Sequence, residues 1–120
     1  MKHEDIKATR EGLVGHKTSS GYIIDVHVPF VALPDVRSLF KIVRITNKLN
    51  NRSILAMVLD VGPWNVHDYD YVFGTSRPQS ESGKDSFNRI TNKAGIDLSE
   101  HVWHYLEMED NTNVDWEFIE

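Results

Sequence analysis

Hydrophobic residues occur along this chain in short runs, and the patterns of these runs are typical of β-strands. Residues 22–28 and 40–46 are rich in β-branched and aromatic side chains, so each predicts a strand. Residues 53–59 are almost continuously apolar, which predicts a strand buried on both faces. Residues 114–119 alternate apolar and acidic side chains, as in a half-buried strand.

One short amphipathic helix is predicted after these first three strands. Ser99 is suited to accept hydrogen bonds from the first turn, and Glu100 carries a charge that the N-terminal end of a helix stabilises. The helix is expected to end near Met108. The apolar residues that follow its spacing are Leu98, Val102, Tyr105 and Leu106.

The remaining segments define the expected domain organisation. Residues 1–12 are charged and lack periodicity, so we interpret them as a mobile lead-in. Residues 13–120 form a single domain. Within it, residues 61–93 contain scattered Gly, Ser, Asn and Pro and are far longer than an ordinary connection, which indicates a functional or mobile loop. Many short strands and one helix in such a length favour a small β-barrel.

Composition excludes several classes of function. The 18 acidic residues outnumber the 13 basic residues, giving a net charge of −5, and this argues against nucleic-acid binding because phosphate contacts need a cationic face. The chain has no cysteine, which excludes thiolate metal sites and thiol nucleophiles. No apolar run is long enough to cross a membrane, so we expect no membrane insertion.

Three ordered segments carry a resemblance to a known family. They are residues 40–47 with the turn and strand start at 51–53, residues 58–64 with the sequence Val-Leu-Asp-Val-Gly-Pro-Trp, and residues 95–99 leading into the helix. Together they resemble the double-psi β-barrel of the rare lipoprotein A family, a group related to expansins, barwin-like proteins and certain lytic transglycosylases. The resemblance implies a mainly β fold, a small six-stranded double-psi β-barrel with one short α-helix. The long loop at 61–93 is an insertion relative to that family, which connects the same segments with far fewer residues.

The same resemblance implies a function. It is cleavage of peptidoglycan glycan strands of the lytic transglycosylase type, with Asp60 at the position of the general acid. The residue pattern agrees, because an Asp that ends an apolar strand is partly desolvated and therefore has a raised pKa. A hydrolase needs a second carboxyl group, whereas a lytic transglycosylase can act with one acid because the sugar's own hydroxyl closes an anhydro ring.

The chain departs from the family pattern at two polar positions. Tyr22 stands where active members have an acidic residue, and Phe30 stands where they have a histidine. Asp25 and His27 lie close by in the sequence, and they are the candidates to assist Asp60. The alternative function is a non-catalytic module that binds peptidoglycan or another polysaccharide, or a virion assembly scaffold that has lost the catalytic residues.

Aromatic and histidine side chains supply candidate substrate contacts, since aromatic rings stack on sugar faces. The substrate-binding candidates are Trp64, Tyr22, Tyr69 and His67. The alternative for the aromatic residues of the long loop is that they anchor it to the barrel. His67 has acidic neighbours, but their spacing matches no tight metal-binding motif, so we expect neither a metal nor another cofactor. For Asp97 we favour a structural role.

The N-terminal residues lack the apolar core of a signal peptide. Because peptidoglycan lies outside the bacterial cytoplasm, this expectation conflicts with a cell-wall substrate. A phage-encoded protein, delivered by other means, would resolve the conflict.

Overall fold

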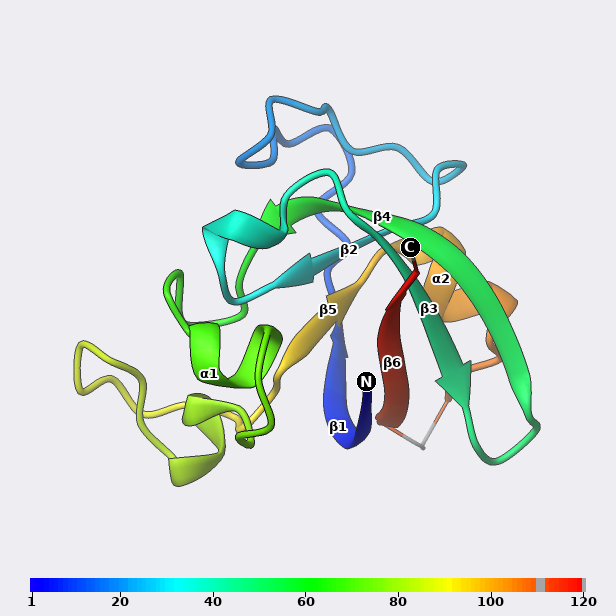
Figure 1. Ribbon diagram of the computed structural model, residues 1–120. Helices are drawn as coiled ribbons and strands as arrows, with labels where there is room; N and C mark the ends of the chain where they lie inside the picture. Colours follow the sequence, from blue (N-terminus) through cyan, green and yellow to red (C-terminus); the bar gives the residue numbers. More distant parts are fainter. Residues whose placement is uncertain (110–111, 120) are drawn as a thin grey trace.

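The computed structural model describes residues 1–109 and 112–119, and its main feature is a closed β-barrel of six strands (Figure 1). The strands are β1 (Lys2–Arg10), β2 (Phe30–Leu33), β3 (Ile42–Asn47), β4 (Arg52–Val61), β5 (Ile96–Leu98) and β6 (Asn113–Ile119). The helices are α1 (Tyr69–Val72), α2 (Glu100–Tyr105) and the 3-10 turns η1 (Val36–Ser38) and η2 (Gln79–Ser82).

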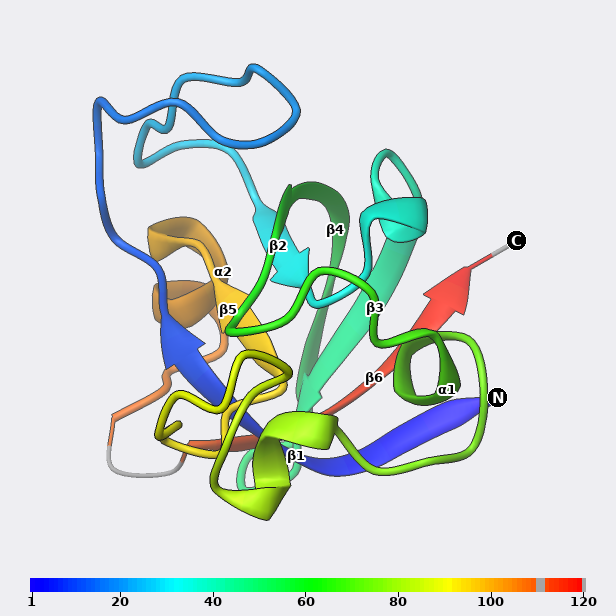
Figure 2. The same cartoon turned by 90° about the vertical axis from the view of Figure 1, so that its left-hand side faces the viewer.

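The strands follow one another around the barrel in the order β1-β5-β2-β4-β3-β6, and β6 pairs with β1 to close it. The pairs β1–β5 and β2–β4 are parallel, and the other four pairs are antiparallel. Figure 2 shows β1 and β6 crossing the lower part of the molecule, with β2 and β5 beside α2. Consecutive strands along the chain are therefore not always neighbours in the barrel.

Alternate residues of the strands fill the barrel interior. Ile6 and Ala8 of β1, Val43 and Ile45 of β3, and Trp116 of β6 are each at most 1% exposed. Since burial of apolar surface contributes roughly 25 cal/mol per Å², this interior is the main source of stability. The side chains between these positions lie on the outer face of the barrel.

The fold class predicted from the sequence is confirmed, because the chain is mainly β and forms a closed six-stranded barrel. The predicted strands at 40–46, 53–59 and 114–119 match β3, β4 and β6 to within a few residues. Ser99 caps α2 as expected, since its Oγ accepts a hydrogen bond from the N–H of Val102.

Four details differ from the expectation. The predicted lead-in, residues 1–12, instead contains β1, which pairs with β5 and β6. Residues 22–28 are loop rather than strand, because they have no partner strand beyond one bridge from Ile23 to Lys17. Strand β4 is not buried on both faces, since Leu55 is 48% exposed. A second short helix, α1, lies within the predicted loop 61–93.

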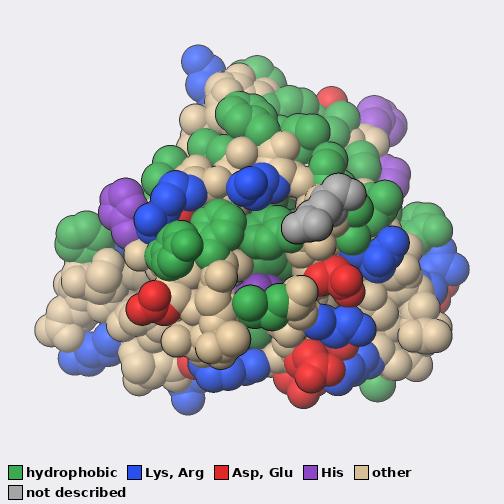
Figure 3. All heavy atoms as spheres, in the orientation of Figure 1, with side chains coloured by type: hydrophobic (Ala, Val, Ile, Leu, Met, Phe, Trp, Pro, Cys, Tyr) green, Lys and Arg blue, Asp and Glu red, His purple; other side chains and the backbone are tan. Residues whose placement is uncertain are grey.

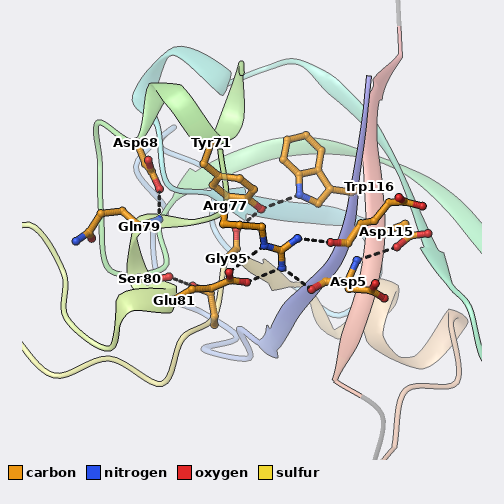
Figure 4. Close-up of polar contacts among 12 residues, drawn as sticks. Asp5, Asp68, Tyr71, Arg77, Gln79, Ser80, Glu81, Gly95, Asp115 and Trp116 are labelled. Atoms are coloured by element: carbon orange, nitrogen blue, oxygen red, sulfur yellow. Dashed lines mark hydrogen bonds and ion pairs between the residues drawn. The ribbon is translucent and has the colours of Figure 1, made fainter. Parts of the chain in front are cut away.

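The inserted segment 61–93 is tied to the barrel by a buried hydrogen-bond chain (Figure 4). The hydroxyl of Tyr71 donates to the carbonyl of Gly95 at 2.9 Å and accepts from Nε1 of Trp116 at 2.8 Å. Both rings are buried and meet edge to face. Buried polar groups need such partners, so Tyr71 satisfies two groups at once and fixes α1 against the barrel.

Arg77 makes a second attachment on the other side of the same segment (Figure 4). Its guanidinium donates to the carbonyls of Glu4 and Asp5 at 2.6 and 2.8 Å, at the point where the pairing of β1 with β6 shifts register. It also pairs with Glu81 of η2 at 2.6 Å. The guanidinium thus links η2 to the irregular part of β1.

Over the described residues, no helix has the length and apolar character needed to span a membrane.

We predict that Tyr71→Phe lowers the free energy of unfolding by about 1–3 kcal/mol, because it leaves two buried polar partners without the hydroxyl. Chemical denaturation followed by tryptophan fluorescence measures this. Tyr69→Phe is the matched control, since Tyr69 is 49% exposed on the same helix and should change stability by less than about 0.5 kcal/mol. Equal effects of the two substitutions would contradict the anchoring role of Tyr71.

Candidate functional site

Strand register brings two carboxyl groups together on the outer face of the barrel. Thr9 of β1 is paired with Asp97 of β5, Asp97 with Ala32 of β2, and Ala32 with Asp60 of β4. Residues paired across neighbouring strands point to the same face. Because adjacent strands lie about 4.8 Å apart, the backbones of Asp97 and Asp60 are roughly 10 Å apart. The small side chain of Ala32 lies between them.

Asp60 is held at the end of β4 by backbone donors. Its Oδ1 accepts hydrogen bonds from the N–H of Val61 at 2.9 Å and of Ser19 at 3.0 Å. Ser19 belongs to a hairpin-like loop, residues 15–24, which is closed by hydrogen bonds from the N–H of Gly15 to the carbonyl of Ile24 and from the N–H of Ile24 to the carbonyl of His16. This loop, the uppermost part of Figure 1, therefore reaches the carboxylate that the sequence identifies as the candidate acid.

Glu11 is a third carboxyl group of this site. It directly follows β1, and its N–H donates to the carbonyl of Leu98 at 2.8 Å, which continues the pairing with β5. Its Oε2 is buried and has no hydrogen-bond partner among the described residues. Burial, as the largest cause, and the neighbouring carboxyl groups of Asp60 and Asp97 together raise the pKa of Glu11 to about 9.

Asp97 shares the same environment. The pKa of Asp97 is raised to about 6. Burial is the main cause and the charge of Asp60 adds to it, while a hydrogen bond from the hydroxyl of Thr9 opposes the rise. A Cβ atom placed on Gly62 would lie 3.9 Å from Oδ2 of Asp97, so the turn after β4 approaches this carboxyl group closely. The φ angle of Gly62 is +141°, a conformation that other residues rarely adopt.

The carboxyl cluster, defined as Glu11, Asp60 and Asp97, can hold a proton at neutral pH. Three carboxylates in partial burial repel one another, and a proton on Glu11 relieves this repulsion and supplies a donor toward Asp60. The arrangement places a neutral carboxylic acid beside a carboxylate, which are the two forms that general acid–base catalysis requires.

Asp25 and His27 occupy the loop that precedes β2. Oδ1 of Asp25 accepts from the N–H of His27 at 2.7 Å and of Val28 at 3.2 Å, an arrangement that stabilises the local turn. Hydrogen bonding to the His27 amide lowers the pKa of Asp25. Among the described residues, neither side chain forms a hydrogen bond or ion pair with Asp60, so their assisting roles stay predictions.

Of the substrate-binding candidates, Trp64 and Tyr22 lie in segments that contact the carboxyl cluster. Trp64 follows the Gly62–Pro63 turn, is half-buried, and donates from Nε1 to Oδ1 of Asn92 at 2.8 Å. Tyr22 belongs to the loop whose Ser19 binds Asp60, and its ring packs edge to face on Phe30 with centroids 5.7 Å apart.

Tyr69 and His67 lie in a different part of the molecule. The guanidinium of Arg37 lies 4.5 Å from the centre of the Tyr69 ring, and Tyr69 also packs on Phe73. His67 pairs through its backbone with Asp35. None of these contacts involves the carboxyl cluster, and substrate binding by Tyr69 and His67 stays a prediction.

Sequence reasoning missed Glu11 because it assigned residues 1–12 to a lead-in, and it interpreted Asp97 as structural. A usable signal was the alternation of Ile6 and Ala8, which are buried, with Lys7 and Thr9, which are not. That alternation extends outward to Glu11. Among the described residues, no group of three His, Asp or Glu side chains is arranged to hold a metal ion.

We predict that the folded protein loses stability as pH rises from 7 to 9, and that Glu11→Gln reduces this loss. The pKa of Glu11 is about 9 in the folded chain and about 4.3 in an unfolded one. The folded state therefore binds the proton more tightly, and its contribution to stability disappears as pH rises through 9. Asp97, with a pKa of about 6, has already titrated below this range.

Urea unfolding at a series of pH values measures the effect. The matched control is Glu4→Gln, which alters an exposed glutamate of the same strand. It should keep the wild-type slope. A Glu11→Gln protein whose stability depends on pH as steeply as the wild type would show that Glu11 is charged at neutral pH.

Comparison with known proteins supports the fold and identifies a family. The Streptomyces papain inhibitor has a similar structure, with a TM-score of 0.58 and 18% sequence identity over 100% of this chain and 96% of that one. At this identity the likeness shows the fold alone. No curated protein matches the sequence. Residues 2–80 match the family described as domain of unknown function DUF8814, and the chain therefore belongs to this family.

Proposed function

We propose that this protein cleaves the glycan strands of peptidoglycan by acid catalysis, in the manner of a lytic transglycosylase. The observation that carries the proposal is that strand register places Glu11 beside Asp60 and Asp97, where burial and these neighbours raise the pKa of Glu11 to about 9. A glycosidic oxygen leaves readily only when it is protonated, so a neutral acid on the barrel surface is the group that this reaction needs.

The resemblance to rare lipoprotein A-like barrels supports the choice of substrate. Asp60, Gly62 and Pro63 match the motif of that group. Active members of that group carry an acidic residue at the position of Tyr22. In this chain Glu11, directly after β1, supplies an acidic side chain near Asp60 instead. Proton donation is therefore assigned to Glu11, with Asp60 beside it, rather than to Asp60 itself.

In the proposed reaction Glu11 gives up one proton and regains one, so it ends each cycle in its starting form. Glu11 donates to the glycosidic oxygen as the bond from this oxygen to the anomeric carbon breaks, and the negative charges of Asp60 and Asp97 stabilise the positive charge that develops on the sugar. The sugar's own primary hydroxyl then bonds to the anomeric carbon, and its proton passes to the carboxylate of Glu11. The products are a free 4-hydroxyl end and an anhydro sugar.

The competing function is a barrel that binds glycan strands without cleaving them. Phe30, which replaces a polar family residue and is fully buried beside Tyr22, favours this alternative. A virion assembly scaffold, delivered with a phage, is the other alternative. Both differ from the enzyme in giving no anhydro product.

We predict that wild-type protein releases anhydro-sugar products from purified sacculi, and that Glu11→Gln and Asp60→Asn each lower the rate by about 100-fold or more. Chromatography with mass spectrometry of the products measures this, on intact sacculi and on sacculi stripped of peptides. Asp70→Asn is the matched control, because Asp70 lies exposed on α1, and it should retain the wild-type rate.

Each alternative result has a distinct meaning. Reducing-end products would establish hydrolysis and require a water-activating carboxylate, for which Asp97 is the candidate. Co-sedimentation with sacculi but no product would leave the binding module. Neither product nor co-sedimentation would exclude a cell-wall substrate and favour the scaffold.

We predict that the rate is constant near neutral pH and falls as pH rises through about 9, the pKa of Glu11. Asp60→Asn should move this fall to lower pH, because removing the negative charge beside Glu11 lowers its pKa. The pH dependence of kcat/KM measures both effects. If Asp60→Asn retains a measurable rate whose alkaline limb is unmoved, Glu11 is not the proton donor.

A further inference from the structure

A second group of polar side chains lies on the same outer face as the carboxyl cluster. Lys7 and Thr9 both point outward from β1, about 7 Å apart along the strand, because Ile6 and Ala8 lie in the core. Nζ of Lys7 donates to the carbonyl oxygen of Asn92 at 2.7 Å. Thr9 hydrogen-bonds to Asp97 of the carboxyl cluster. Lys7 is the outward-facing residue of β1 next to Thr9, so it lies beside this cluster.

Asn92 also holds an aromatic ring at this position. Its side-chain Oδ1 accepts from Nε1 of Trp64 at 2.8 Å. The backbone of Trp64 has a left-handed φ of +69°, and its carbonyl accepts from Arg89 at 3.2 Å. Trp64 is therefore held through both its indole and its backbone, and it follows the Gly62–Pro63 turn, whose Gly62 lies close to Asp97.

Lys7 brings a positive charge that the protein does not neutralise. Across residues 1–109 and 112–119 its ammonium group hydrogen-bonds to a carbonyl oxygen and forms no ion pair. Arg89, the other cation near Trp64, is paired with Asp85 at 2.5 Å. An ammonium group with free donor capacity beside a half-buried ring is suited to a ligand that carries both an apolar face and an anionic group.

We propose that Lys7 determines specificity for an acidic glycan by binding a carboxylate on the sugar that stacks on Trp64. This inference rests on the proposed function and names the substrate class of the same site. The sugar lies beside the carboxyl cluster rather than on it, so its carboxylate is separated from the acidic groups that would repel it. Asn92 is a positioning residue, because it fixes the ammonium group and the indole together.

The test measures binding by calorimetry, with Glu11→Gln protein so that no cleavage occurs. The two ligands are peptide-free glycan strands with their sugar carboxylates intact and the same strands with these carboxylates reduced to alcohols. We expect Lys7→Met to weaken binding of the intact strands about tenfold and to leave binding of the reduced strands unchanged. Lys7→Arg should restore binding. Lys41→Met, which removes an exposed lysine elsewhere, is the control.

Asn92→Ala provides a second, independent variant. It should weaken binding of both ligands, because it removes the side-chain oxygen that holds the indole of Trp64, while the backbone carbonyl that accepts from Lys7 is retained. Unchanged binding of both ligands to this variant would overturn the positioning role.

The remaining outcomes separate the two proposals. If the Glu11→Gln protein binds intact and reduced strands with equal affinity, and Lys7→Met changes neither affinity, the specificity inference is wrong while glycan binding stands. If neither ligand binds, the proposed function fails and the specificity inference fails with it.

Discussion

Strand β1 pairs in parallel with β5 and in antiparallel orientation with β6, and this double pairing closes the barrel. The same register fixes the outer face. Once Ile6 and Ala8 enter the core, Lys7 and Thr9 must face outward, and Glu11 continues from them. A one-residue slip would reverse every one of these positions, so the core and the carboxyl cluster depend on a single register.

The carboxyl cluster acts against the stability that the core provides. Burying Glu11 near Asp60 and Asp97 raises its pKa to about 9, which means that the folded chain disfavours its charged form. A surface serving only solubility would have no reason to bring three carboxyl groups together. Groups with strongly shifted pKa values concentrate at functional sites, which makes this cluster the candidate site.

The inserted segment contributes to the site through its attachments. Tyr71 and Arg77 tie its central part to the barrel, and Trp64 and Asn92, near its two ends, meet beside Lys7. Segments of this length are often functional. The Trp64 ring belongs to the segment and Lys7 to β1, so these two side chains lie together only when the segment is docked on the barrel.

The sequence by itself determined the elements whose signals are local. Periodicity and propensity predicted β3, β4 and β6, the capping preference predicted Ser99 at the start of α2, and the motif ending in Gly62–Pro63 pointed to Asp60. Residues 22–28 show the limit of propensity, because β-branched residues without a partner strand remain a loop.

Only the tertiary structure decided the rest. The polar segment at 1–12 becomes a strand because β5 and β6, from the other end of the chain, offer backbone partners. Glu11 meets Asp60, and Lys7 meets Asn92, through contacts between distant parts of the sequence. Such contacts leave no local pattern, since pairing across a barrel is set by closure and register rather than by the residues on either side of each position.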